Sequence, residues 1–205
     1  MTGSNGFIAK NLIQFLSEQD DINILCFNRN SSEDDLKDAV IKADWIIHLA
    51  GVNRPLNEQE FVKGNITLTQ KIADLLKEHN KKTPIILSSS IQAEQDNAYG
   101  QSKLGGEQVL IDLNNNQGNP VYICRLANVF GKWSRPNYNS AVATFCHNIA
   151  NDLPIQINNP DAVIRLVYID DVVEAFWQMI EGHYSPEQYF VIEPEYQITV
   201  GGLAD

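Results

Sequence analysis

The chain of 205 residues is 43% hydrophobic and 20% charged, which gives it enough apolar material for one substantial core. A formal net charge of −11 at pH 7 argues against a surface that holds nucleic-acid phosphate or anionic lipid, so any phosphate-bearing ligand must be held locally. Because no stretch approaches the ~20 apolar residues of a membrane span and no signal-peptide pattern is visible, we expect a cytoplasmic protein without nucleic-acid or membrane partners.

The first half of the chain alternates between short runs rich in Ile, Val and Leu and longer segments with helical spacing. Near-continuous apolar runs are typical of strands in a sheet that is covered on both faces, and they predict strands at 22–27, 45–50, 84–89 and 121–126. Apolar residues at helical spacing predict helices at about 7–16, 66–76 and 99–113. This alternation predicts an α/β fold with a Rossmann-like doubly wound parallel sheet.

The pattern changes after about residue 127. Amphipathic helices are predicted around 142–153 and 172–180, and short strands around 155–157, 163–169 and 197–200. This different pattern of helices and strands indicates a small C-terminal substrate lobe. We therefore expect a dinucleotide-binding part at residues 1–126 and a substrate-binding part at residues 127–205.

The cysteines and histidines suggest neither disulfides nor a metal site. Cys26, Cys124 and Cys146 each lie in an apolar run, where cysteine usually serves as a small hydrophobic residue, so we expect buried free thiols and a reducing compartment. The histidines share no metal-ligand spacing, and no metal is predicted.

A glycine turn opens the chain. Gly3, Gly6 and Ala9 have the spacing GxxGxxA directly before a helical pattern, where the free N–H groups of a helix start can hold a pyrophosphate. The predicted cofactor-binding residues of this turn are Gly3, Asn5, Gly6, Phe7 and Ile8. Taken alone, the spacing is equally typical of a simple turn.

The strand that should precede such a turn is apparently missing. Met1 and Thr2 are the residues ahead of Gly3, and the chain stops at GGLAD soon after the strand predicted at 197–200. The first strand of a doubly wound sheet is central, so its absence leaves neighbouring strands with unpaired backbone groups. We therefore expect a truncated chain.

Tyr99 and Lys103 form the candidate proton-handling pair. Their i, i+4 spacing in YGQSK places both side chains on one helix face, where the lysine charge should lower the pKa of the phenol. A surface Tyr and Lys at common helical spacing is the alternative. The triplet Ser88–Ser90 favours the catalytic interpretation, because hydroxyls at the carboxyl end of a parallel strand face the ligand crevice.

Six motifs in this order, TGSNGFIA, HLAG, LSSS, YGQSK, RLANVFG and RLVYIDDVV, resemble the extended short-chain dehydrogenase/reductase family of nucleotide-sugar epimerases, dehydratases and reductases. The resemblance implies an NAD(P)-dependent oxidoreductase in which Tyr99 is the acid, Lys103 its partner and a ribose ligand, and Ser90 the hydroxyl that polarises the carbonyl. It also implies cofactor contacts at Leu49, Ala50 and Asn65, although an exposed helix asparagine is an equal alternative for Asn65. A homodimer through the helix that bears Tyr99 and the helix before it is a further implication.

More narrowly, HLAGVNRP, SSSIQA and FGKWSRPNYNSAVATFCHNIA resemble the bacterial capsular polysaccharide reductases that act on the 4-keto group of a UDP-2-acetamido-2,6-dideoxyhexulose, in capsule or O-antigen sugar biosynthesis. In those enzymes a metal-binding cupin domain follows the reductase domain. No cupin sequence is present in this chain, which agrees with the expected truncation.

The predicted cofactor is NADPH. The strand predicted at 22–27 is followed by Asn28 and Arg29, where an NAD-selective domain usually offers a carboxylate to the ribose 2′-hydroxyl. An arginine suits a 2′-phosphate instead, because guanidinium forms charge-assisted paired bonds with phosphate oxygens. A solvated Arg29 in a loop remains the alternative.

The predicted reaction is a net reduction. Ile91 and Gln92 stand where the related 4,6-dehydratases carry an acidic pair, and elimination needs those carboxylates. An NAD-dependent nucleotide-sugar epimerase and a non-catalytic, truncated nucleotide-binding protein remain the alternatives.

The substrate-binding residues are predicted from the second half of the chain. The resemblance implies that Asn128 and Arg165 bind the pyrophosphate region of the UDP-sugar, although Leu166 replaces an acidic residue that is more usual there. The loop between them offers side chains for the sugar or uridine, unless they simply face solvent: Lys132, Arg135, Asn137 and Asn139.

Overall fold

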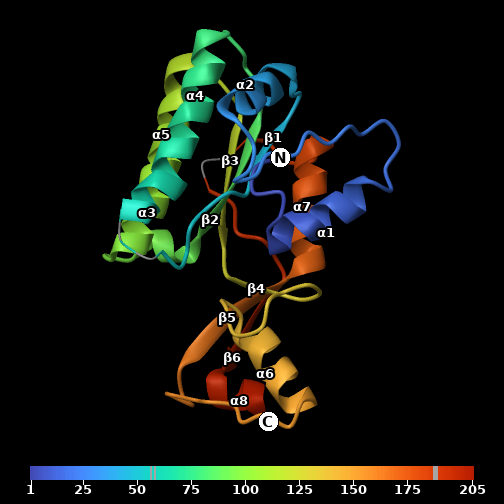
Figure 1. Ribbon diagram of the computed structural model, residues 1–205, viewed down its shortest axis with the longest axis vertical. Coiled ribbons are helices and arrows are strands. Elements are labelled where there is room, and N and C mark those ends of the chain that lie inside the picture. The colour runs from blue at the N-terminus through green and yellow to red at the C-terminus, as the bar shows by residue number, and fades with distance from the viewer. Residues whose placement is uncertain (56, 58, 187–188) are drawn as a thin grey trace.

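The computed structural model describes residues 1–55, 57, 59–186 and 189–205, and it places them in two unequal parts (Figure 1). The larger part contains a parallel sheet between two layers of helices. The smaller part, which lies below it in Figure 1, contains a second sheet and two helices. The chain passes from one to the other where its first sheet ends.

The larger part follows the predicted alternation of helix and strand. In chain order it contains α1 (Phe7–Leu16), α2 (Glu33–Lys42), β1 (Ile46–His48), α3 (Gln59–Phe61), a π-helical segment (Val62–Thr67), α4 (Leu68–Glu78), β2 (Ile85–Ser90), a 3₁₀ segment (Ile91–Glu94), α5 (Ala98–Gln117) and β3 (Val121–Leu126). The α2 helix was not predicted, although Ser32 and Asp35 form a capping box at its start.

The first sheet has the order β1-β2-β3, and all of its strands are parallel. Side chains alternate between its faces, as strand geometry requires. Ile47 and Ile86 face the cluster that contains α1 and α7, whereas Ile46 and Ile85 face α2, α4 and α5. Burial on both faces explains why the strands read as continuous apolar runs, and the predicted α/β fold is confirmed.

The second part holds a three-stranded sheet of mixed direction. Its elements are β4 (Asn128–Phe130), α6 (Ala141–Ala150), β5 (Val163–Tyr168), β6 (Glu195–Thr199) and α8 (Val200–Ala204). β4 pairs with β5 in parallel, and β5 pairs with β6 antiparallel. The short strand predicted at 155–157 is not formed.

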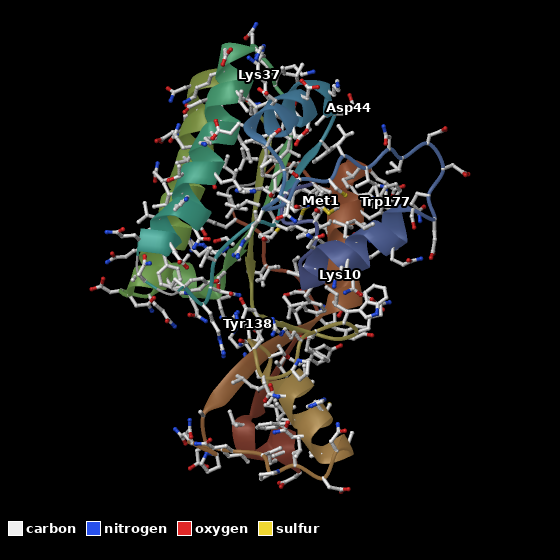
Figure 2. All side chains as sticks on the ribbon, viewed as in Figure 1. Met1, Lys10, Lys37, Asp44, Tyr138 and Trp177 are labelled. Atoms are coloured by element: carbon white, nitrogen blue, oxygen red, sulfur yellow. The ribbon has the colours of Figure 1, made fainter. Side chains whose placement is uncertain are left out.

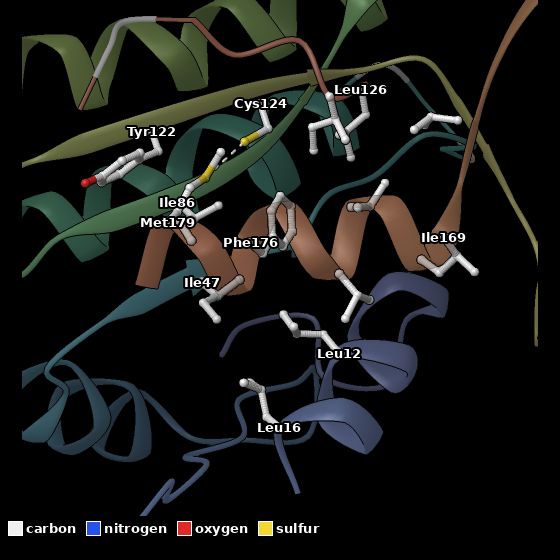
Figure 3. Close-up of a cluster of buried hydrophobic side chains, with 14 residues drawn as sticks. Leu12, Leu16, Ile47, Ile86, Tyr122, Cys124, Leu126, Ile169, Phe176 and Met179 are labelled. Carbon is white, nitrogen blue, oxygen red and sulfur yellow. Dashed lines mark hydrogen bonds between the residues drawn. The ribbon is translucent and has the colours of Figure 1, made fainter. Parts of the chain in front are cut away.

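The α7 helix (Ile169–Ile180) returns from the second part to cover the first sheet. Its Phe176 is fully buried, and Figure 3 shows it among side chains from the sheet and from α1, including Ile86 and Leu12. Residues beyond 126 therefore build part of the first core as well as the second sheet.

The segment predicted as a strand at 22–27 forms isolated backbone bridges instead. Thr2 lies between Phe27 and His48 in parallel with both, and the Met1 amino group donates to the Leu25 carbonyl at 2.6 Å. The segment is therefore joined to its neighbours by single bridges and not by a regular ladder. A cavity of about 320 Å³ lies beside them, lined in part by Ile24 and Trp45.

The predicted burial of the cysteines is wrong for two of them. Cys124 is buried, and burial raises the pKa of its thiol, whereas Cys26 and Cys146 are exposed. Cys26 lies in the 22–27 segment, which lacks a regular strand partner, and Cys146 lies on α6 of the smaller part. In the described part of the chain, no helix is long and apolar enough to cross a membrane.

A short apolar extension ahead of Met1 is expected to stabilise the protein. Burial lowers the pKa of the Met1 amino group, so the folded state disfavours its charged form there. Four added residues alternating Ile and Val would replace that ammonium by a peptide bond and fill the 320 Å³ cavity. We expect the melting temperature to rise by more than about 5 °C.

The matched control is an extension of the same length made of Gly and Ser. It also removes the buried ammonium but supplies no apolar side chains for the cavity. Equal melting temperatures for the two extended chains would contradict the expected filling of this cavity by apolar side chains.

Candidate active site

The first turn of α5 is fixed against the end of β2 by close packing. The Asn97 side chain accepts a hydrogen bond from the Gly100 amide at 2.8 Å and so caps the helix. A Cβ on Gly100 would lie 2.4 Å from the carbonyl oxygens of Gln92 and Gln95, so only glycine permits this approach. The helix start therefore lies directly against the 3₁₀ segment that follows Ser90.

Tyr99 and Ser90 meet at this contact. Both side chains line the same cavity, and the Tyr99 ring lies 5.6 Å from the ring of Phe61. Burial raises the pKa of Tyr99, while the neighbouring Ser90 hydroxyl opposes that change. The predicted lowering of this pKa by Lys103 is therefore wrong, because burial outweighs other influences. A phenol that keeps its proton at neutral pH is the form that a general acid requires.

Lys103 lies one helical turn farther along α5. Its ammonium group donates to the Ser88 carbonyl at 3.0 Å, and protein atoms enclose it although the side chain as a whole is only partly buried. Burial lowers its pKa to about 8, and the charge of Glu107 opposes that shift. The spacing in YGQSK thus places both functional groups at the carboxyl end of β2.

Asn65 joins the loop after β1 to α5 through hydrogen bonds. It is buried, its side-chain oxygen accepts from the Val52 amide at 2.8 Å, and its amide group donates to Ser102 Oγ at 2.8 Å. This placement is not that of an exposed helix asparagine. A Cβ on the neighbouring Gly51 would lie 3.3 Å from the Lys103 ammonium, so the loop passes close to Lys103.

The glycine turn packs against the same loop. Gly3 has φ +67°, and a Cβ there would lie 2.7 Å from the Ala50 nitrogen. The α1 helix begins after Gly6, and among the described residues no side chain caps it and no acidic residue stands in its first turn. Its first N–H groups are therefore available to an anion, which fits the pyrophosphate of a dinucleotide.

A cavity of about 1030 Å³ lies at the carboxyl ends of the strands, between the two parts of the molecule. Nine of the predicted site residues line it: Phe7, Ile8, Leu49, Ser90, Tyr99, Lys103, Asn128, Asn137 and Asn139. Topologically, this is where open parallel sheets bind their ligands. The cavity therefore brings together the groups predicted for catalysis, cofactor and substrate.

Several predicted residues lie outside the lining of this cavity, within the described part of the chain. Arg165 forms a paired ion bridge with Glu195, at 2.6 and 2.8 Å, and Lys132 pairs with Asp170 at 3.1 Å. Arg135 lies over the ring of Tyr138, and Arg29 is exposed. Asn5 and Gly6 are exposed at the turn.

Sequence reasoning missed the side chains that bridge the two parts at the cavity. The Tyr138 hydroxyl donates to the side-chain oxygen of Asn53 at 3.1 Å, and Arg54 lies over the Tyr138 ring at 5.4 Å. Figure 2 shows Tyr138 at the junction of the two parts. Asn53 and Arg54 stand within the motif HLAGVNRP, whereas nothing in the sequence indicates that Tyr138 is their partner.

His48 lies behind the site and does not line the cavity, as far as the described lining residues go. Its ring nitrogens bond to Thr2 and Thr69 at 2.6 and 2.9 Å, and burial lowers its pKa to about 3. A neutral imidazole held by two hydroxyls is a structural group. Across residues 1–55, 57, 59–186 and 189–205, no group of acidic, cysteine and histidine side chains could hold a metal ion.

The chain is similar to known proteins over its whole length. The profile of the NAD dependent epimerase/dehydratase family matches residues 1–192. A UDP-2-acetamido-2,6-beta-L-arabino-hexul-4-ose reductase of Pseudomonas aeruginosa is 51% identical over 205 residues, which are 100% of this chain and 55% of that protein. The chain thus spans about half the length of this relative.

Solved structures show the same similarity. The capsular polysaccharide assembling protein CapF from Staphylococcus aureus superposes with a TM-score of 0.88 at 44% identity, over 98% of this chain and 55% of that one. A UDP-glucuronic acid 4-epimerase from Bacillus cereus in complex with NAD gives a TM-score of 0.85 at 20% identity, over 98% and 80%. At 20% identity, the similarity to the Bacillus cereus structure shows the fold alone.

The shifted pKa of Lys103 predicts a pH-dependent stability. Its folded-state pKa is about 8 against a reference of 10.5, so between these values the unfolded chain binds more protons and stability rises with pH. The stability of the wild type relative to Lys103→Met should therefore increase by roughly 1–2 kcal/mol between pH 7.5 and 9.5. Urea unfolding of both proteins at several pH values measures this difference, and a constant difference would contradict the shift.

Proposed function

The chain belongs to the NAD dependent epimerase/dehydratase family, and from this membership we propose that it reduces the 4-keto group of a UDP-2-acetamido-2,6-dideoxyhexulose with NADPH. The observation that carries the proposal is that Tyr99, Ser90 and Lys103 line one cavity of about 1030 Å³, with the Lys103 ammonium bonded to the Ser88 carbonyl at the end of the same strand. The 51% identity to a reductase of such a sugar supports the substrate class. That relative is about twice as long, so the activity of this chain rests on the site itself.

A nicotinamide dinucleotide fits the α1 side of the cavity. The uncapped start of α1 suits its pyrophosphate, Phe7 and Ile8 border the cavity, and Asn65 and Gly51 set the loop that lies near Lys103. When bound there, the reduced cofactor supplies a hydride to the carbonyl carbon. Arg29 would select the 2′-phosphate of NADPH, because it stands in the loop after the segment that pairs with Thr2.

The residues of the chain supply the proton and orient the carbonyl. Tyr99 keeps its hydroxyl proton at neutral pH and donates it to the carbonyl oxygen as negative charge develops there. Ser90 donates a second hydrogen bond to the same oxygen. Lys103 places a positive charge next to the phenolate that Tyr99 becomes, which favours that charged state.

The nucleotide-sugar would occupy the side of the cavity formed by the second part. Asn128, Asn137 and Asn139 line that side, and their amides suit the polar groups of a sugar or uridine. Three basic residues would also bind the nucleotide-sugar if its negative charges replaced their present contacts: Lys132, Arg135 and Arg165. We also propose, on family resemblance, a homodimer through α4 and α5.

Net reduction fits the residues better than elimination. Ile91 and Gln92 follow Ser90 in the 3₁₀ segment, and neither offers the carboxylate that would move protons at C5 and C6. An epimerase that retains NAD is the competing function. The two differ in whether NADPH is consumed.

Replacing the proton donor is expected to abolish turnover without affecting cofactor binding. For Tyr99→Phe we expect kcat for NADPH oxidation with a UDP-4-ketohexosamine to fall by about 10²- to 10⁴-fold. The dissociation constant of NADPH, measured by fluorescence titration, should stay within about twofold, because the hydroxyl acts on the substrate. Tyr196→Phe, on an exposed tyrosine of β6, is the matched control.

Three outcomes of this assay would contradict the proposal. Full activity in Tyr99→Phe would exclude the tyrosine as the acid. Sugar interconversion without NADPH consumption would indicate an epimerase. Binding of NADPH without turnover by the wild type would indicate a nucleotide-binding protein.

Cofactor choice is tested at Arg29. Removal of its guanidinium in Arg29→Ala should weaken NADPH binding by about 10- to 100-fold, the value of one or two hydrogen bonds to a charged group, and leave NADH binding unchanged. Lys10→Ala, which removes an exposed cation from α1, is the control. Equal effects on NADPH and NADH would assign Arg29 no role in the choice.

A further inference from the structure

A buried carboxylate lies behind the proposed catalytic pair. Glu107 follows Lys103 by one turn of α5, and its side chain is 0% exposed. An ionised carboxylate is costly to bury unless charged or polar partners surround it. The proposed mechanism does not use this residue, so its burial calls for another explanation.

The partners of Glu107 come from two neighbouring strands of the sheet. Ser89 Oγ donates to one of its oxygens, and the Arg125 guanidinium donates to both, through Nε at 3.1 Å and Nη2 at 2.6 Å. Ser89 and Arg125 are register partners across β2 and β3. One carboxylate therefore ties α5 to both strands, one residue before Ser90.

Arg125 extends the contact to the segment that follows Ser90. Arg125 Nη1 donates to the Glu94 carboxylate of the 3₁₀ segment at 2.8 Å, and the Arg125 guanidinium lies 3.9 Å from the centre of the Tyr189 ring. The Glu94 side chain is 73% exposed, whereas that of Arg125 is 15% exposed. The enclosed ion pair is thus Arg125 with Glu107, and Glu94 is an outer, solvated partner.

We propose that Glu107 is a positioning residue for the reduction. It holds α5, and with it Tyr99 and Lys103, against the end of β2 that carries Ser90. The proposal rests on the proposed function for the reaction that is positioned. It accounts for a buried charge with three hydrogen bonds next to the end of β2 that carries Ser90.

The electrostatic surroundings give the proposal a specific readout. Besides Glu107 itself, the titratable and charged groups near Lys103 and its neighbours are Tyr99 on α5, His48 on β1, Glu94 on the 3₁₀ segment and Arg125 on β3. Burial keeps His48 and Tyr99 neutral at working pH, while the charge of Glu107 raises the pKa of Lys103. Neutralising Glu107 should therefore lower the pKa of Lys103.

The test is Glu107→Gln, which keeps the size of the side chain and part of its hydrogen bonding. We expect kcat for NADPH oxidation to fall by about 10- to 100-fold, as misplacement of catalytic groups does, with the KM for the nucleotide-sugar nearly unchanged. The alkaline limb of the pH–kcat profile should move to lower pH. A merely structural role would lower the stability of Glu107→Gln and leave kcat of the folded protein unchanged.

Two further variants separate positioning from loss of folding. Ser89→Ala removes only the bond to β2 and should reduce kcat in the same direction, even if Glu107→Gln folds poorly. Glu94→Gln removes the other carboxylate on Arg125 and should leave kcat and the pH profile unchanged. Wild-type kcat and pH profile in a folded Glu107→Gln protein would overturn the proposal.

A measurement without substrate distinguishes this inference from the proposed function. The difference in unfolding free energy between the wild type and Lys103→Met is expected to rise with pH as Lys103 loses its proton. The same difference can be measured in the Glu107→Gln background, between Glu107→Gln and the double variant Glu107→Gln/Lys103→Met. The rise should begin at lower pH when Glu107 is neutralised. If the wild type turns over no nucleotide-sugar, the proposed function fails, whereas an unmoved rise overturns the role of Glu107.

Discussion

The buried ion pair between Glu107 and Arg125 is the contact on which the geometry of the site depends. A buried carboxylate with fixed donors adds directional hydrogen bonds to the apolar packing of a helix on parallel strands. Here the donors stand on β2 and β3, and Gly100 allows the helix start to approach the 3₁₀ segment closely. Tyr99 consequently meets Ser90, and Lys103 meets the end of β2.

The two parts of the molecule contribute different chemistry to one cavity. β2 and α5 supply the proposed catalytic groups and α1 the proposed anion-binding helix start, whereas the second part supplies amide side chains from β4 and the loop after it. The contact of Tyr138 with Asn53 joins these two sides (Figure 2). A site assembled in this way suits a ligand pair in which a dinucleotide and a nucleotide-sugar meet at Tyr99.

The sequence predicted what depends on local pattern and missed what depends on distant partners. The strands β2 and β3 were located to within a residue, because burial on both faces leaves a continuous apolar run. The segment 22–27 is similarly apolar but forms isolated contacts, in which Phe27 pairs with Thr2 and the Leu25 carbonyl accepts from the Met1 amino group. Arg165 was assigned to a ligand on family resemblance, and the sequence did not show its pairing with Glu195, 30 residues away. Burial, which raises the pKa of Tyr99, cannot be deduced from YGQSK.

A crystal structure of the chain with NADP⁺ and UDP bound would test most directly whether the 1030 Å³ cavity is one site for two ligands. We expect the dinucleotide pyrophosphate at the start of α1, the nicotinamide ring beside Tyr99 and Ser90, and UDP against Asn128 and Asn139. This expectation would be contradicted by a nicotinamide ring bound away from Tyr99, or by UDP bound outside this cavity.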